Sequence, residues 1–311
     1  MLKLYKTSPV EKNIKKIKKI TPDCWIDLTS PTNDEIDKVV AKTLVEKDLI
    51  TTMLDVEELP RVERSGNATL VVVDTPYQDE DHQYTTIPLG IIITDNSYVI
   101  TVSPKRTTIL NSFKQDKIKE FRTAKKTRFL IQILLHTAAS YLRVLKQVNN
   151  DIEEKEEELK KSTKNSDIVD MLEIEKTLVY FMTSLKANDR VLEKLSKGNM
   201  LPLYENDREL IEDAIIENKQ AMEMATIYKD ILLSIKDTYS TIVSNNLNIA
   251  MKFLAAATIV LSIPTMISSF LGMNIDLGKI TTIENALPLV IIISLITSII
   301  VVILLKKKDM F

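Results

Sequence analysis

Small and polar residues recur at alternating intervals of four and three positions from Asp237 to Gly272. The members between these two are Thr241, Ser244, Asn248, Met251, Ala255, Thr258, Ser262, Thr265 and Ser269. On an α-helix this spacing places them all on one face, which we call the polar stripe. Hydroxyl and amide oxygens accept hydrogen bonds from the water around a cation, but they do not cheaply strip that water from a strongly hydrated ion. The stripe therefore predicts a water-facing path for a hydrated cation.

Tight packing between membrane helices is the alternative explanation, because it also favours Ala, Ser and Thr. A packing seam rarely continues outside the bilayer as a row of Asp, Thr, Ser and Asn, as this one does between Asp237 and Asn248. We therefore favour the water-facing interpretation. One such helix cannot enclose a path, so the stripe also predicts a symmetric homo-oligomer, with the striped helix inside and a second span outside.

Two uncharged segments, residues 253–275 and 286–305, are each long enough to cross a membrane, although 27% of the whole chain is charged. About 20 apolar residues span the hydrocarbon layer as a helix, so we expect a multi-pass protein in the lipid bilayer of the cell membrane. Lys252 precedes the first segment and three lysines at 306–308 follow the second. The positive-inside rule then places both chain ends in the cytoplasm. The N-terminal residues lack an apolar signal-peptide region, so the charged body is expected to remain there.

The first 120 residues have the pattern of an α/β domain. Runs rich in β-formers occur at residues 1–5, 24–28, 68–77, 84–94 and 97–103. Residues 94–97 (TDNS) predict a hairpin turn between the last two runs. Residues 30–35 (SPTNDE) predict a helix start, because they offer a capping group, a proline in the first turn and acids near the positive end of the helix dipole.

The following residues have the pattern of long helices. We expect helices over 125–197 with a break at 162–166, and then one long helix from about 207 to 271 that contains no glycine and only one proline, Pro264. Its membrane-distal part carries an apolar heptad seam, which predicts packing against other helices. The seam comprises Ile211, Ala214, Asn218, Ala221, Ala225, Tyr228, Leu232, Ile235, Tyr239 and Ile242.

Several functional classes are disfavoured by the composition. The one cysteine, Cys24, excludes an intrachain disulfide framework and a cysteine-based zinc site. None of the five glycines belongs to a phosphate-binding loop, so we expect neither a nucleotide nor a nucleic acid as partner. His82 and His136 are isolated, without the spacing of a metal site or a catalytic triad. A membrane-anchored enzyme or signalling protein therefore remains only a remote alternative, and the chain is expected not to be an enzyme.

The end of the stripe resembles the CorA family of magnesium channels. Gly272-Met273-Asn274 stands at the outer end of the first span, and residues 244–254 (SNNLNIAMKFL) are similar to the segment where that family's stalk enters the membrane. The resemblance implies a homopentamer whose Gly-Met-Asn ring acts as the selectivity filter, with Asn274 holding hydrated Mg²⁺ through its water. It also implies that Asn248 is the inner pore asparagine, that Met251 and Leu254 are apolar constrictions and that Thr265 lines the pore.

The resemblance further implies regulatory Mg²⁺ sites between cytoplasmic domains, built from acids, whose occupation closes the channel. Counting from the motif without gaps places Asp213 and Asp237 at acidic stalk positions. Asp55, Glu57 and Glu58 are the possible partner acids. One departure from the family pattern is Leu271, which stands where an aromatic residue commonly precedes the motif.

Together these observations predict an α+β fold with a cytoplasmic α/β/α domain and a long stalk helix that continues into the first of two C-terminal transmembrane helices, assembled as a pentameric funnel. The expected boundaries are a cytoplasmic α/β domain at 1–120, a cytoplasmic long-helix region at 121–204, the stalk helix at 205–250, the pore-lining span at 251–273, an external loop at 274–285, the second span at 286–305 and a basic cytoplasmic tail at 306–311. The expected function is Mg²⁺ influx, with Mg²⁺ as both the transported and the regulatory ion. A related carrier of Co²⁺, Ni²⁺ or Zn²⁺ is the alternative that the same fold and motif would serve.

Overall fold

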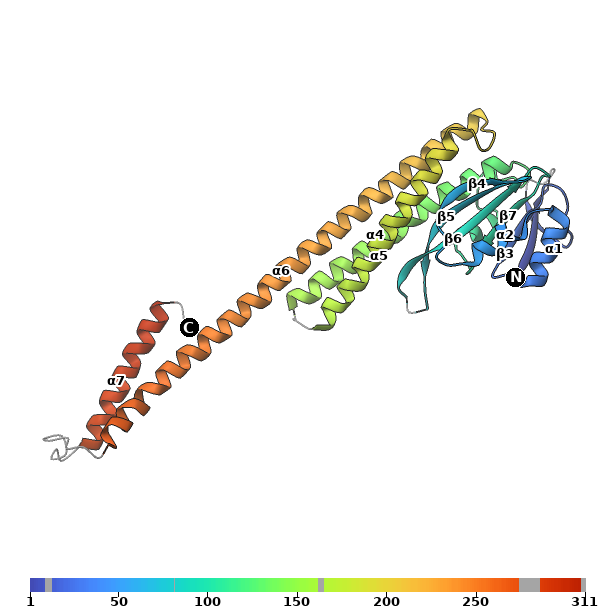
Figure 1. The fold of residues 1–311 in the computed structure, drawn as a ribbon. Coiled ribbons are helices and arrows are strands. Elements are labelled where there is room, and N and C mark those ends of the chain that lie inside the picture. Colours follow the sequence, from blue (N-terminus) through green and yellow to red (C-terminus); the bar gives the residue numbers. More distant parts are fainter. Residues whose placement is uncertain (9–12, 81, 162–164, 274–285, 309–311) are drawn as a thin grey trace. The chain divides into compact units, whose positions relative to one another are not determined.

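The computed structural model describes residues 1–8, 13–80, 82–161, 165–273 and 286–308 (Figure 1). The chain divides into two compact units, Met1–Ser234 and Ile235–Phe311. The helix α6 (Glu205–Leu271) contributes residues to both. Each unit is described separately below.

The first unit is built on a seven-stranded sheet with the order β2-β1-β3-β7-β6-β5-β4. The strands are β1 (Leu2–Thr7), β2 (Ile14–Ile17), β3 (Trp25–Thr29), β4 (Arg61–Ser65), β5 (Ala68–Gln78), β6 (Tyr84–Thr94) and β7 (Val99–Ser103). Within the described residues β3 and β7 are parallel and every other neighbouring pair is antiparallel. The hairpin turn expected at 94–97 is confirmed between β6 and β7.

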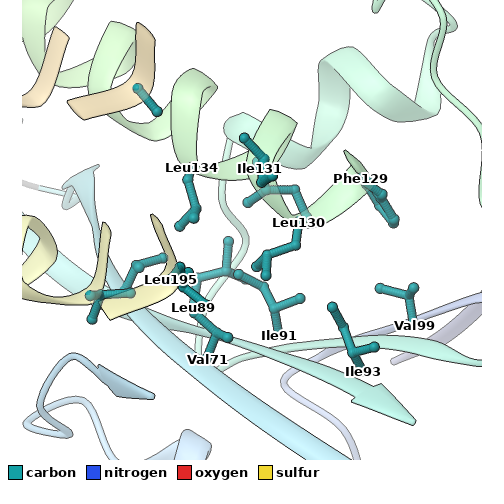
Figure 2. Close-up of a cluster of buried hydrophobic side chains, with 14 of the residues drawn as sticks. Val71, Leu89, Ile91, Ile93, Val99, Phe129, Leu130, Ile131, Leu134 and Leu195 are labelled. Carbon is teal, nitrogen blue, oxygen red and sulfur yellow. The ribbon is translucent and has the colours of Figure 1, made fainter. Parts of the chain in front are cut away.

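Helices cover both faces of this sheet. One face packs against α1 (Asn33–Thr43), α2 (Lys47–Thr51) and the short helix η1 (Thr52–Leu54). The other packs against α3 (Ile109–Lys114), α4 (Lys126–Lys161), α5 (Asn165–Ser196) and the start of α6. Figure 2 shows α4 residues such as Leu130 and Leu134 above Val71 and Ile91 of the strands. The expected α/β/α layering is therefore present in this unit.

The helix start expected at 30–35 is confirmed as the first turn of α1. Thr32 is the N-cap, and its side chain accepts a hydrogen bond from the Glu35 backbone N–H while Glu35 Oε2 accepts one from the Thr32 N–H. Glu35 Oε1 also accepts a hydrogen bond from the Leu2 N–H at 2.8 Å. The cap therefore ties α1 to the first strand as well as satisfying its own backbone donors.

The seam of α6 is mostly buried as far as Tyr239, with Tyr228 and Ile235 half-buried, whereas its last member, Ile242, is exposed. Ile211, Ala214, Ala221, Ala225 and Leu232 are 0–2% exposed. Asn218, the one amide of this set, is also buried, and its Nδ2 donates to the backbone carbonyl of Leu185 in α5 at 3.1 Å. This hydrogen bond offsets the desolvation cost of burying the amide and links α6 to α5.

The second unit contains the remainder of α6 and α7 (Ala286–Lys307). Both α6 and the apolar segment Leu287–Lys307 contain stretches long and hydrophobic enough to cross a membrane. Val260, Leu261, Pro264 and Ser268 of α6 line a groove of about 470 Å³ together with Val290, Ile291, Ser294, Leu295 and Ser298 of α7. The two apolar helices therefore face one another along this groove.

Candidate ion pathway

The polar stripe is exposed along its described length. Every member from Asp237 to Gly272 is exposed in the single chain. The two apolar residues that the resemblance assigns to a constriction, Met251 and Leu254, are 62% and 64% exposed. Whatever covers this face therefore comes from outside the described chain.

The opposite side of α6 is partly covered. Ala256 is buried, and Ala257, Val260, Ile263, Pro264, Ile267 and Leu271 are half-buried. At about 100° per residue these positions lie on the side of the helix away from Ala255, Thr258, Ser262, Thr265 and Ser269. Val260 and Pro264 also line the groove shared with α7. The second apolar helix therefore occupies the face that the stripe does not use.

Three hydroxyl groups of the stripe donate hydrogen bonds to the backbone of α6. Thr258 Oγ1 donates to the Leu254 carbonyl at 2.8 Å, Ser262 Oγ to the Ile259 carbonyl at 2.8 Å and Thr265 Oγ1 to the Leu261 carbonyl at 3.1 Å. Because each hydroxyl proton is bonded to the helix backbone, the oxygen lone pairs remain as acceptors. Acceptors are what the water shell of a cation requires, since its protons point outward.

The C-terminal end of the stripe, Gly272, is described together with the next residue, Met273. The Gly272 N–H donates to the Ser268 carbonyl at 3.0 Å, and the Met273 N–H donates to the Phe270 carbonyl at 3.4 Å. Asn274 and the expected loop at 274–285 lie outside the described residues. The filter expected at Gly272-Met273-Asn274 therefore remains a prediction.

The predicted regulatory acids are distributed over the chain. Asp213, Asp237, Asp55 and Glu57 are exposed, whereas Glu58 is half-buried and forms an ion pair with Arg61. Asp55 Oδ1 accepts a hydrogen bond from the Glu57 backbone N–H at 3.0 Å. Within the described part of the chain no three His, Cys, Asp or Glu side chains lie close enough together to hold a metal ion. A regulatory Mg²⁺ bound by these acids would therefore need ligands from a second copy or from water.

Glu217 is an acid that the sequence pattern did not single out. It lies one turn after Asp213 on α6 and is half-buried, with Oε2 buried and lacking a hydrogen-bond partner among the described residues. Burial raises the pKa of Glu217, His136 opposes the shift and the Asp213 charge adds to it. The i, i+4 spacing of two acids could have identified this pair.

The two histidines are not near a shared site. His136 shares a hydrogen bond of 2.8 Å between Nδ1 and the Gln132 carbonyl one turn earlier, and its ring packs edge-on against Phe113. His82 lies in the β5–β6 connection with a positive φ. Cys24 is fully buried in the sheet core.

Comparisons with known proteins agree with the motif at the end of α6. Residues 23–307 match the family described as CorA-like Mg²⁺ transporter protein. The chain is 29% identical over 259 residues to the Cobalt/magnesium transport protein CorA of Methanocaldococcus jannaschii, covering 80% of this chain and 79% of that protein. It is 22% identical over 311 residues to the protein of the same name from Thermotoga maritima, covering 98% of this chain and 88% of that protein.

A solved structure extends this likeness to the fold. The complete structure of the CorA magnesium transporter from M. jannaschii matches with a TM-score of 0.89 and 25% identity, covering 100% of this chain and 99% of that one. The α/β domain, the long helix and the C-terminal apolar helix are thus those of the CorA fold. The chain belongs to the family of CorA-like Mg²⁺ transporters, which are membrane transporters and not enzymes.

Proposed function

We propose that this chain is one subunit of a channel that carries hydrated Mg²⁺ across the cell membrane into the cytoplasm. The observation that carries the proposal is the exposed stripe of acceptor oxygens on the face of α6 away from α7. The names of the relatives, Cobalt/magnesium transport protein CorA, agree with a divalent cation as cargo.

A closed ring of copies completes the pathway. Each chain offers one polar face on α6, so several stripes must meet around a common axis to surround an ion, with the α7 helices toward lipid. We take the number of copies to be five, as the family resemblance implies. The exposed polar row between Asp237 and Asn248 would then face the axis on the cytoplasmic side.

Three positions along this axis have distinct roles. Asn274 holds the hydrated ion at the outer mouth, with Gly272 and Met273 shaping that turn. Asn248 is the inner polar ring. Met251 and Leu254, exposed and apolar on the same face, form the narrow dry segment that blocks ions when the channel is closed.

Internal Mg²⁺ closes the channel through carboxylates between neighbouring copies. Asp213 and Asp237 are the stalk acids, and Asp55, Glu57 and Glu58 are the partner acids, with Glu217 added beside Asp213. Carboxylate oxygens are the ligands that Mg²⁺ prefers, together with retained water. Like charges brought together at an interface repel, so an ion bound there stabilises the closed assembly relative to the open one.

Ion flux into proteoliposomes containing the full chain tests the function. We expect uptake of Mg²⁺ driven by a negative internal potential, loss of uptake in Asn274→Ala and Asn248→Ala, and retained uptake in Asn246→Ala. Asn246 is the matched control because it lies on the same helix but off the stripe. Parallel measurements with Co²⁺, Ni²⁺ and Zn²⁺ separate the magnesium channel from a related carrier, and Zn²⁺ uptake without Mg²⁺ uptake would overturn the proposal.

A further inference from the structure

A cavity of about 330 Å³ lies at the carboxyl end of β3 and β7, far along the chain from the stripe. These two strands form the parallel pair of the described sheet. The cavity is lined by Met1, Lys3, Tyr5, Thr29, Arg106, Asn111, Lys114 and Gln115.

A polar row crosses the sheet beneath this cavity. Lys3 of β1 pairs with Asp27 of β3, which in turn pairs with Thr101 of β7, so the three side chains share one face. Asp27 is 2% exposed, and its Oδ1 accepts a hydrogen bond from Thr101 Oγ1 at 3.3 Å. Thr101 Oγ1 accepts one from Trp25 Nε1 at 2.8 Å. The row is therefore anchored in the aromatic core.

Asp27 positions Lys114 at the wall of the cavity. Lys114 Nζ lies 2.6 Å from Asp27 Oδ2 and 5.6 Å from the centre of the Trp25 ring. An ammonium group has three protons, and this pair uses one of them. The others remain available to a ligand, on a side chain that is held in place by a buried partner.

The cavity has an excess of positive charge. Lys3 and Arg106 line it and have no acid within ion-pair distance among the described residues. With Lys114 offset by Asp27, two positive charges remain unbalanced at the wall. Tyr5 adds a neutral donor, since burial, followed by the Asp27 charge, raises the pKa of its phenol. Asn111 and Gln115 add amide donors.

We propose that this cavity binds the phosphoryl group of a small soluble anion. A phosphate group carries close to two negative charges at neutral pH and presents several strong acceptor oxygens, which matches two unbalanced cations and a third held by Asp27. The guanidinium of Arg106 can bind two of these oxygens at once, while lysines bind them as point charges. The volume is at the small end of the range for ligand pockets, so the phosphoryl group itself is the recognised element.

Equilibrium dialysis of the full-length protein in detergent tests this site, with ³²P-labelled pyrophosphate in a buffer containing EDTA at constant ionic strength. We expect saturable binding of one pyrophosphate per chain and displacement by unlabelled phosphate and adenosine triphosphate more than by sulfate. Lys3→Gln/Arg106→Gln should weaken binding by at least about tenfold, because two charge-assisted contacts are lost. Lys38→Gln/Lys42→Gln, which removes the same charge from exposed positions of α1, should bind like the wild type.

These outcomes distinguish a specific phosphoryl-binding site from general electrostatic attraction. Absence of saturable binding to the wild type would overturn the proposal, as would equal weakening in both double variants or displacement by sulfate as strong as by phosphate. Arg106→Gln alone serves as a second variant, since Arg106 is exposed and its replacement leaves the sheet untouched. Because EDTA removes Mg²⁺, the result does not depend on ion transport.

Discussion

Pro264 and Thr265 are consecutive residues of α6, and only the first of them faces α7. Pro264 is half-buried and lines the groove shared with Ser294, whereas Thr265 is exposed and its hydroxyl is bonded to the Leu261 carbonyl at 3.1 Å. Ala256, Val260, Ile263 and Ile267 share the covered side with Pro264, whereas the stripe residues Ala255, Thr258, Ser262 and Ser269 are exposed like Thr265. One side of the helix is therefore next to its neighbouring span, and the stripe side is not.

Met251 on the stripe and Leu254 beside it should act as the barrier of the closed channel. Replacing Met251 with Asp places a charge in the dry segment and should hydrate it. We expect a Mg²⁺ leak into proteoliposomes at high internal Mg²⁺, where the wild type is closed. Asn246→Asp introduces the same charge off the stripe and should remain closed. An unchanged closed-state flux in Met251→Asp would place the barrier elsewhere.

Mg²⁺ removal should loosen the N-terminal part of the assembly. If Mg²⁺ bridges Asp213 to a neighbouring copy, millimolar Mg²⁺ should protect the wild type from protease, and Asp213→Lys should lose part of that protection. Glu212→Lys is the matched control, because Glu212 is exposed next to Asp213 but points to another side of α6. Equal protection of all three proteins would leave Asp213 as a solvated surface residue.

The half-buried Asp74 should make the α/β domain less stable as pH rises. Its Oδ2 accepts a hydrogen bond from Ser184 Oγ at 2.6 Å, but burial dominates and raises the pKa from 3.8 to about 6. Between these values the unfolded chain loses its proton first, so the free energy of unfolding falls with rising pH. The loss from Asp74 reaches about 3 kcal/mol by neutral pH.

Fluorescence of Trp25, the one tryptophan, reports unfolding of this domain because its side chain is fully buried. Urea titrations at pH 4.5 and pH 7 should show a smaller pH effect in Asp74→Asn than in the wild type. Asp230→Asn, at an exposed position on α6, should keep the wild-type difference. If Asp74→Asn also kept the wild-type pH difference, ionisation of Asp74 would not lower the free energy of unfolding.

Gly90 of β6 is required by the close approach of Met53. A Cβ atom at position 90 would lie 2.5 Å from Met53 Cγ and 2.7 Å from its sulfur. Gly90→Ala should therefore lower the free energy of unfolding by about 1–3 kcal/mol. In the Met53→Ala background the same change should cost less, because the clash is gone. Trp25 fluorescence in urea titrations measures both free energies of unfolding. If Gly90→Ala cost the same in both backgrounds, contact with Met53 would not be the reason that position 90 requires glycine.

Sequence patterns predicted the central strands because most of their side chains are apolar or β-branched, as in β7, which reads VITVS and is buried throughout. They missed β2 and β4, the two outer strands of the sheet, which read IKKI and RVERS. Charged side chains on edge strands prevent pairing with other chains, and they also hide the strand from a hydrophobicity pattern. The phosphoryl cavity was likewise not visible, since Lys3, Arg106 and Lys114 come together only through the pairing of β1, β3 and β7.

The stripe was visible in the sequence because, on a regular helix, the spacing between residues determines which face each side chain occupies. The structure adds that α7 lies on the other side of α6, and the water-facing role of the stripe stays a prediction. The proposed regulatory acids could not be paired from one chain, because a site that is shared between copies, as we propose, would leave no local pattern in the sequence of either.

Thiol modification of the stripe during ion flux tests the central claim most directly. In a Cys24→Ala background, Ser262→Cys and Thr265→Cys place thiols on the stripe, and Ile267→Cys places one on the covered face. A membrane-impermeant, positively charged thiol reagent should block Mg²⁺ flux through the first two variants, and high Mg²⁺ should slow the block. Flux through Ile267→Cys should continue. Block of Ile267→Cys with no effect on Ser262→Cys and Thr265→Cys would contradict a pathway along this face of α6.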